Sequence, residues 1–222
     1  IASSAIGASS NCPPHLTAIA RHMGIDFNLE QWEKLGHNIP LLVNCQPAGV
    51  YLGESFHRAG GVPAVMKELS EHSKLHAGCL TVSGKSVANN VAESSIQNEE
   101  VIRRYKRPLR EKAGFLVLSG NLFNGALIKT CVISDDFRSK YLSKVDDENC
   151  FNARCIVFDG PEDYHANIDN PALGIDESCM LTIRGCGPVG YPGSAEVVNM
   201  QPPAEMIRGG IDTLPTMGDG RQ

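Results

Sequence analysis

The sequence contains no apolar stretch of about 18 residues, so it predicts no membrane-spanning helix. It has no excess of basic residues either. Its 20 Lys and Arg stand against 25 Asp and Glu, a net charge of −5, which gives nucleic-acid binding no support. The one short basic run, residues 103–107, is more typical of a solvated linker or surface face. What remains is a globular composition, 42% hydrophobic and 20% charged over 222 residues, enough for one large domain or two small ones.

The signatures of P-loop nucleotide binding, of a serine nucleophile elbow and of HExxH zinc enzymes are also missing. The eight cysteines form no Cys-x-x-Cys pair, which gives little support to a zinc or cluster site built from this chain alone. Several lie inside apolar, strand-like runs, as Cys131 does, and this disfavours a disulfide framework. We therefore expect buried, reduced thiols and a reducing compartment. The cytoplasm is the expected location, with the mitochondrion left open.

The first eight residues are small and apolar, with no basic region and no initiator Met. They predict a start within a longer chain and no signal peptide.

Residues 11–36 have the pattern of two helices. The first is expected to be capped by Asn11, to have Pro13 in its opening turn and to end at Gly24. One face of this helix carries the apolar residues Leu16, Ile19, Ala20 and Met23. The second helix has the Asn28 and Gln31 spacing of a capping box and is expected to end at Gly36.

Short apolar runs alternate with helices in the rest of this first part. Residues 39–44 suit a buried strand. Gly60 and Gly61 open a predicted helix whose Val65, Met66 and Leu69 face inward. This alternation indicates the edge of an α/β domain.

The character of the sequence changes near residue 99. A charged segment at residues 103–112 contains Pro108 and suits a linker. Strand-like runs bounded by turn residues follow, at residues 114–119, 126–134, 154–158 and 180–184, with helical patterns at 161–168 and 203–207. The sequence therefore predicts a mixed α/β (α+β) protein. The end of an α/β domain would occupy residues 1–97, and a β-barrel-like domain with small helices would occupy residues 98–222.

The most distinctive segment, residues 184–196, is rich in glycine and proline. Gly loses much backbone entropy and Pro donates no ladder bond, so the segment suits neither a helix nor a central strand. We expect it to wrap closely around another part of the site. Glu196 closes it with a lone carboxylate, which suits a hard cation such as Mg²⁺. A surface or helix-capping Glu explains the same pattern equally well.

Two further segments are candidates for binding anions. The Gly-Asp-Gly-Arg sequence at residues 218–221 suits either a nest of N–H groups, with Arg221 binding a carboxylate, or a plain hairpin turn. Ser9 and Ser10 precede the first predicted helix and suit an anion site at its N-terminus, although ordinary capping needs only Asn11.

Two polar segments fit structural roles better than functional ones. The acid-rich residues 159–165 are typical of a capped helix N-terminus, where negative charge is favourable. Glu54, His57 and Arg58 are more typical of a polar loop than of a pocket.

Several long motifs occur together: residues 53–62 (GESFHRAGGV), 118–122 (LSGNL), 157–162 (VFDGPE), 185–196 and 218–221 (GDGR). In this order they resemble the dihydroxy-acid and sugar-acid dehydratase family, and the resemblance runs over essentially all of the chain. Residues 44–49, 157–165 and 190–193 look more like the aldonic-acid branch, of arabinonate or xylonate type, than like the enzyme of branched-chain amino-acid synthesis.

The resemblance implies an α/β domain that carries an iron–sulfur cluster, 2Fe–2S or 4Fe–4S, and a β-barrel-like domain that closes over it. The three cluster cysteines would lie upstream of Ile1, and none of the eight cysteines here falls on those motifs. Of the Mg²⁺ ligands only Glu196 would belong to this chain. The catalytic serine would follow Gln222 directly, with Arg221 shaping its turn and with Ser9 and Ser10 as further site-shaping candidates.

The implied reaction is dehydration of a 2,3-dihydroxy acid to a 2-keto acid. Mg²⁺ would hold the substrate carboxylate and 2-hydroxyl, the serine alkoxide would remove the C2 proton, and cluster iron would assist the departing 3-hydroxyl. The chain would be an internal piece, inactive alone, of a homo-oligomeric enzyme with a small sugar acid as substrate and no nucleic-acid or membrane partner. Two alternatives stay open: a dihydroxy-acid dehydratase of branched-chain amino-acid synthesis, and an inactive fold remnant that acts as a binding module.

Overall fold

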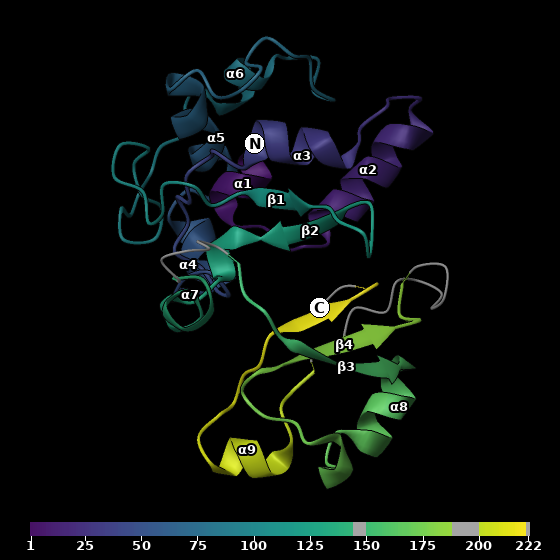
Figure 1. The fold of residues 1–222 in the computed structure, drawn as a ribbon. Coiled ribbons are helices and arrows are strands. Elements are labelled where there is room, and N and C mark those ends of the chain that lie inside the picture. The colour runs from purple at the N-terminus through teal and green to yellow at the C-terminus, as the bar shows by residue number, and fades with distance from the viewer. Residues whose placement is uncertain (144–149, 188–199, 221–222) are drawn as a thin grey trace. The chain divides into compact units, whose positions relative to one another are not determined.

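The computed structural model describes residues 1–143, 150–187 and 200–220. Glu196 and Arg221 therefore lie outside the described residues. The chain divides into two compact units, Ile1–Ser134 and Asp135–Gln222 (Figure 1). The domain boundary that the sequence places after residue 97 rests on a change of composition, and it stays a prediction.

Unit 1 is mainly helical. Its helices are α1 (Ala2–Ile6), α2 (Cys12–His22), α3 (Leu29–Gly36), α4 (Gly53–Arg58), α5 (Gly61–Glu71) and α6 (Val87–Val91). Its strands β1 (Phe115–Leu118) and β2 (Ala126–Lys129) pair antiparallel and lead into a 3₁₀ turn, Thr130–Val132. The predicted capping box is confirmed, because the Asn28 side chain accepts from Gln31 N–H at 3.2 Å and the Gln31 side chain accepts from Asn28 N–H at 3.1 Å.

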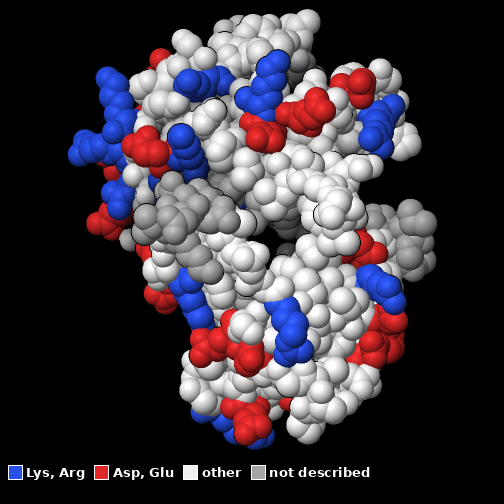
Figure 2. All heavy atoms as spheres, in the orientation of Figure 1, with Lys and Arg blue, Asp and Glu red and all other residues white. Residues whose placement is uncertain are grey.

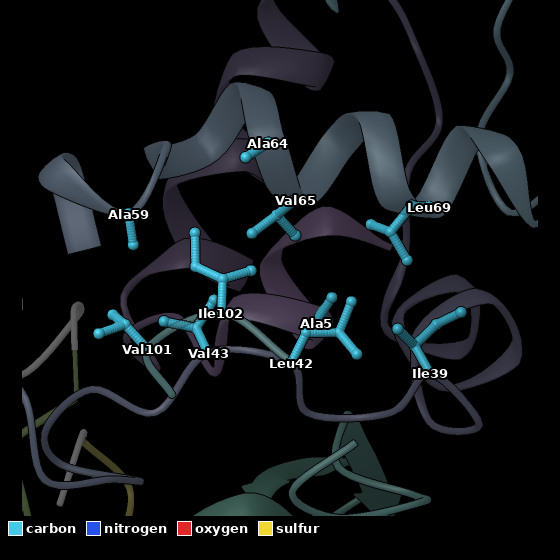
Figure 3. Packing of buried hydrophobic residues seen from close by; sticks show 10 residues of the cluster. All are labelled: Ala5, Ile39, Leu42, Val43, Ala59, Ala64, Val65, Leu69, Val101 and Ile102. Carbon is cyan, nitrogen blue, oxygen red and sulfur yellow. The ribbon is translucent and has the colours of Figure 1, made fainter. Parts of the chain in front are cut away.

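The core of unit 1 lies between α5, α1 and the segment around residues 39–43. Figure 3 shows Val65 and Leu69 pointing from α5 toward Leu42 and Val43, and all four side chains are fully buried. The predicted inward face of α5 is thus confirmed for these two residues, while Met66 is only half-buried. The predicted strand over residues 39–44 is buried but forms isolated bridges, Leu41 to Arg110 and Val43 to Ile102, instead of a continuous ladder.

Helix α2 departs from the sequence prediction in two ways. Its cap residue Asn11 has helical backbone angles, and its side chain makes no capping hydrogen bond to the helix. The apolar residues of its predicted face are exposed in part: Leu16 by 42%, Ile19 by 60% and Met23 by 74%.

Unit 2 is built on a parallel sheet. Strands β3 (Arg154–Asp159), β4 (Cys179–Arg184) and β5 (Thr216–Gly218) pair in that order, all parallel. The helices are α7 (Asp135–Tyr141), α8 (Gly160–Asn167) and α9 (Ala204–Arg208), with a 3₁₀ turn at Pro171–Leu173. Helix α8 connects β3 toward β4, as parallel neighbours require.

The core of unit 2 gathers alternate residues of the strands against α8. Ile156 and Phe158 of β3 and Leu181 and Ile183 of β4 are buried together with Tyr164 of α8. The Tyr164 hydroxyl accepts from Gln201 N–H at 2.7 Å and lies 3.1 Å from Gln201 O, which attaches the segment after residue 200 to this core.

Helices and strands mix in both units, which confirms the α/β class. The sheets of the described residues have two and three strands and close no barrel, so the barrel stays a prediction. Nor does any helix in the described ranges have the length and hydropathy to span a bilayer.

The cysteine prediction is correct in part. The eight cysteines, all within the described residues, form no disulfide, and Cys131, Cys179 and Cys186 are buried. The prediction of burial was wrong for Cys79, Cys150 and Cys155, which are exposed.

Acidic and basic side chains are interspersed over the face drawn in Figure 2, in keeping with the small net charge.

Candidate functional site

The strands of unit 2 all end at one edge of the sheet. Asp159 ends β3 opposite Arg184 of β4, and Gly218 ends β5 opposite Ile183. Loops that leave the carboxyl ends of parallel strands form the usual ligand-binding crevice of open α/β sheets. Both glycine-rich segments singled out in the sequence begin at this edge, one after β4 and the other within β5.

Asp219 joins these two segments. Its Oδ2 accepts the backbone N–H of Gly185 at 2.8 Å, and its Oδ1 accepts that of Cys186 at 2.9 Å. Gly185 has φ of 79°, a left-handed conformation that glycine adopts without strain. Two consecutive amides that converge on one carboxylate form a small anion nest, and the nest is filled by the chain's own side chain.

Glycine is needed where the two segments touch. A Cβ on Gly187 would lie 2.9 Å from Asp219 O, and a Cβ on Gly220 would lie 2.6 Å from Cys186 O. Both distances are shorter than a real Cβ contact, so neither position accepts a side chain without movement of the backbone. The sequence prediction of close wrapping is confirmed for residues 185–187, which contact the Gly-Asp-Gly turn.

An ion pair closes the neighbouring part of the edge. Arg184 donates from Nε and Nη2 to the Asp159 carboxylate, with Nη2 to Oδ2 at 3.2 Å. The Arg184 hydrogen bond holds the pKa of Asp159 below its ordinary value. Asp163 accepts from Asp159 N–H at 2.8 Å and from Asn167 Nδ2 at 2.6 Å. The acid-rich residues 159–165 therefore lie at the start of α8, as predicted, but Asp159 at the cap position makes no side-chain capping hydrogen bond to the helix.

Cys186 is 2% exposed and lies at the contact of the two segments. Burial, followed by the carboxylates of Asp219 and Glu162, raises the pKa of its thiol. Both causes disfavour the thiolate, which is the nucleophilic and metal-binding form. The arrangement therefore assigns Cys186 to packing and not to nucleophilic chemistry.

The other predicted site residues are placed as follows. Glu196 and Arg221 lie outside the described residues, which stop at Gly187, resume at Met200 and stop again at Gly220. In unit 1, Ser9 Oγ accepts the N–H of Asn11 at 3.2 Å. This bond supplies a local turn before α2, and a role of Ser9 and Ser10 in binding stays a prediction.

Glu54, His57 and Arg58 lie on helix α4, so the expectation of a polar loop was wrong, while an exposed structural role still fits them. Glu54 and Arg58 form an ion pair at 2.6 Å between Oε1 and Nη2, with side chains exposed by 73% and 77%. Such an exposed pair one helical turn apart is typical of a solvated helix surface.

The sequence missed the role of Asp219. The pattern of residues 218–221 predicted a nest of N–H groups or a hairpin turn, and neither interpretation gave the Asp219 side chain a role. The available signal was its position directly after a strand, where a short carboxylate reaches backbone amides of the neighbouring loop.

The described residues do not by themselves form a metal centre. Within residues 1–143, 150–187 and 200–220, no three His, Cys, Asp or Glu side chains group closely enough to hold an ion. At the sheet edge, both oxygens of Asp219 and of Asp159 accept hydrogen bonds. We therefore assign no chemical step through Mg²⁺ or an iron–sulfur cluster to these residues.

Two family models match the chain in succession. The N-terminal model of the dihydroxy-acid/6-phosphogluconate dehydratases matches residues 1–90, and the C-terminal model matches residues 100–222. The chain belongs to this family. The resemblance noted from its motifs is therefore confirmed.

Similar proteins include several sugar-acid dehydratases. The chain is 55% identical to a D-xylonate dehydratase of Caulobacter vibrioides over 218 residues, 98% of the chain and 36% of that protein. It is 39% identical to an L-arabinonate dehydratase of Rhizobium leguminosarum, with the same two shares covered. It is 34% identical to a dihydroxy-acid dehydratase of Flavobacterium psychrophilum, over 97% of the chain and 36% of that protein. The chain thus spans little more than a third of the length of these relatives.

Proposed function

We propose that the protein carrying this chain is a hydro-lyase that dehydrates a five-carbon sugar acid, of the D-xylonate type, to a 2-keto-3-deoxy acid. The observation that carries this proposal is the 55% identity to a D-xylonate dehydratase, against 34% to a dihydroxy-acid dehydratase of nearly equal coverage. The motifs of residues 44–49 and 190–193 favour the same branch.

The reaction removes water from a 2,3-dihydroxy acid. The C2 proton and the 3-hydroxyl leave, and the resulting enol tautomerises to the 2-ketone. The contribution of the described residues is to hold the backbone together at this edge of the sheet. Asp219 and the close glycine contacts hold two loops together where the parallel strands end, and the Asp159–Arg184 pair flanks them.

Mg²⁺ and an iron–sulfur cluster belong to this proposal as cofactors of the family. When bound, they would supply Lewis-acid stabilisation of charge at the substrate oxygens. We propose further that residues 98–222 contribute to a β-barrel-like domain after an α/β domain in residues 1–97, and that the protein is a cytoplasmic homo-oligomer.

Glu196 is the residue of this chain that we propose as a Mg²⁺ ligand. Glu196→Gln in the protein that carries the chain removes a charged oxygen ligand, so we expect at least about a tenfold higher Mg²⁺ requirement with an unchanged fold. Magnesium titration of activity, together with circular dichroism, measures both. Normal activity at low Mg²⁺ would remove Glu196 from the site.

The test of the function uses the protein that carries this chain, purified without oxygen and supplied with Mg²⁺. Formation of 2-keto acid is assayed with D-xylonate, L-arabinonate, D-galactonate and 2,3-dihydroxyisovalerate. We expect turnover of the pentonates, with D-xylonate preferred. Preference for 2,3-dihydroxyisovalerate would assign the protein to branched-chain amino-acid synthesis, and absence of all turnover would favour the inactive binding module.

A further inference from the structure

The hydrogen-bonded ladder between β4 and β5 ends at Ile183 and Gly218. Beyond that point no strand pairing connects the described residues that follow β4 with those that follow β5. Asp219 continues the connection, because its two carboxylate oxygens accept the N–H groups of Gly185 and Cys186 at 2.8 and 2.9 Å. The side chain thus takes the place of two further ladder bonds.

The contact that Asp219 makes is close as well as polar. Gly187 and Gly220 bring backbone against backbone, with room for no Cβ at either position. The carboxylate fixes the direction of approach and the glycines fix the distance. Gly187, Asp219 and Gly220 therefore form one contact, although Gly187 lies more than 30 positions before the other two in the sequence.

We propose that Asp219 is a positioning residue of the proposed dehydratase, which holds residues 185–187 and its own turn, residues 218–220, in a fixed register on which turnover depends. The inference rests on the proposed function. Asp219 is assigned no contact with substrate. It acts through the backbone of residues 185–187 and of its own turn.

Replacing a positioning residue lowers turnover more than stability, whereas replacing a purely stabilising residue lowers mainly stability. Asp219 and Gly185 are exposed, and an Asn at position 219 keeps one oxygen that can accept the N–H of the buried Cys186, so the loss of global stability is expected to be small. The rate of turnover is more sensitive, since a misplacement of about 1 Å in a catalytic site can lower the rate by about 100-fold. The structure therefore predicts a large loss of turnover for a small loss of stability.

Asp219→Asn in the full protein tests the positioning role. The amide has the same shape as the carboxylate, but only its oxygen can accept a backbone N–H. Its NH₂ group faces the second N–H, so one of the two hydrogen bonds is lost. The matched control is Asp176→Asn. Asp176 is also exposed and also accepts a backbone N–H, from Ser178 at 2.8 Å, but it precedes β4 at the opposite end of the strand. Steady-state kinetics with D-xylonate, thermal unfolding, and hydrogen exchange of the peptide covering residues 181–187 are measured for both variants.

We expect Asp219→Asn to lower kcat by about tenfold or more with KM changed less than about threefold, and to speed exchange at residues 185–186. Asp176→Asn is expected to leave kcat and the exchange at residues 185–186 unchanged. Its change in Tm is expected to be as small as that of Asp219→Asn. Unchanged kcat or unchanged exchange in Asp219→Asn overturns the proposal, and so does an equal loss of activity in the two variants. If the wild-type protein turns over no sugar acid, the proposed function fails and the positioning role fails with it. The exchange experiment then still decides whether Asp219 holds the two loops.

Discussion

Glu68 of α5 is a charged side chain inside unit 1, only 4% exposed, and its carboxylate has three partners. Oε1 accepts the N–H of Tyr105 at 2.8 Å and lies 3.5 Å from His72 Nε2, while Oε2 accepts from Arg104 Nη1 at 3.2 Å. A buried charge is tolerated because these partners satisfy it. Glu68 therefore ties α5 to the segment around residue 105.

Glu68→Ala is expected to lower the free energy of unfolding by about 2–3 kcal/mol, because it leaves the N–H of Tyr105 without its acceptor and removes the buried carboxylate that pairs with the half-exposed Arg104. Glu71→Ala is the control. Glu71 lies on the same helix and faces Lys67 at 3.5 Å, but its side chain is 53% exposed, so a change below about 0.5 kcal/mol is expected. Urea unfolding of both variants measures the difference, and equal losses would contradict the role of Glu68.

The Asp159–Arg184 pair predicts a pH effect at the sheet edge. Arg184 lowers the pKa of Asp159, so the folded state favours the charged carboxylate. The pair's contribution is complete above the ordinary pKa of Asp and is lost as the pH falls through the lowered pKa of Asp159. NMR titration of the Asp159 carboxyl carbon is expected to give a midpoint below the ordinary value, and Arg184→Gln is expected to move it upward. An unmoved midpoint in the variant would show that Arg184 is not the cause.

At the residue scale, the sequence identified chemical types better than partners. It correctly assigned the acids of residues 159–165 to the start of a helix, because charge near a helix N-terminus follows a local rule. It could not foresee that Asp219 reaches Gly185 and Cys186. Those partners lie 34 and 33 positions away, and only the parallel register of β4 and β5 brings them together.

The start of α5 depends on an unusual backbone conformation. Gly60 has φ of 115°, and a Cβ at this position would lie 2.5 Å from Ser95 O and 2.6 Å from Ala64 Cβ. Gly60 thus turns the chain into the helix while the segment around residue 95 passes directly against it. Only a residue without a side chain meets both demands.

Gly60→Ala is therefore expected to destabilise the protein by more than about 2 kcal/mol, through backbone strain and the clash with Ser95. Gly53→Ala, at the first residue of α4, is the control, since nothing lies within 4 Å of its Cβ position. The control is expected to stay within about 1 kcal/mol of wild type. Thermal unfolding compares the two, and a Gly60 variant as stable as the Gly53 variant would refute the requirement for glycine.

At the element scale, local signals predicted well what local forces decide. The Asn28 and Gln31 capping box, the end of α3 at Gly36, and strands β1, β3 and β4 follow from short patterns within the chain. The sequence failed where tertiary contacts decide. Residues 39–44 have the apolar run of a strand, yet their pairing partners are single residues near 102 and 110, so no ladder extends.

At the scale of the whole chain, sequence motifs predicted the family, and the two family models confirm it. Long motifs in fixed order survive changes that blur periodicity, and so they identify a family better than they predict an architecture. The barrel could not be tested from local strands. Closure is a property of all the strands together, and the described residues include only a pair and a group of three.

The two compact units have separate cores, which predicts that a core substitution acts first on its own unit. Leu69 in unit 1 and Leu181 in unit 2 are both fully buried, and truncation of either to Ala removes the same atoms. Each change is expected to cost about 2–5 kcal/mol through lost burial and the cavity left behind. Hydrogen exchange with mass spectrometry is expected to show faster exchange in α5 for Leu69→Ala and in β3 and β4 for Leu181→Ala, with the other unit unchanged. Equal acceleration in both units by either variant would mean that the chain unfolds as one cooperative body, in which case the division at residue 134 describes its contacts and not its stability.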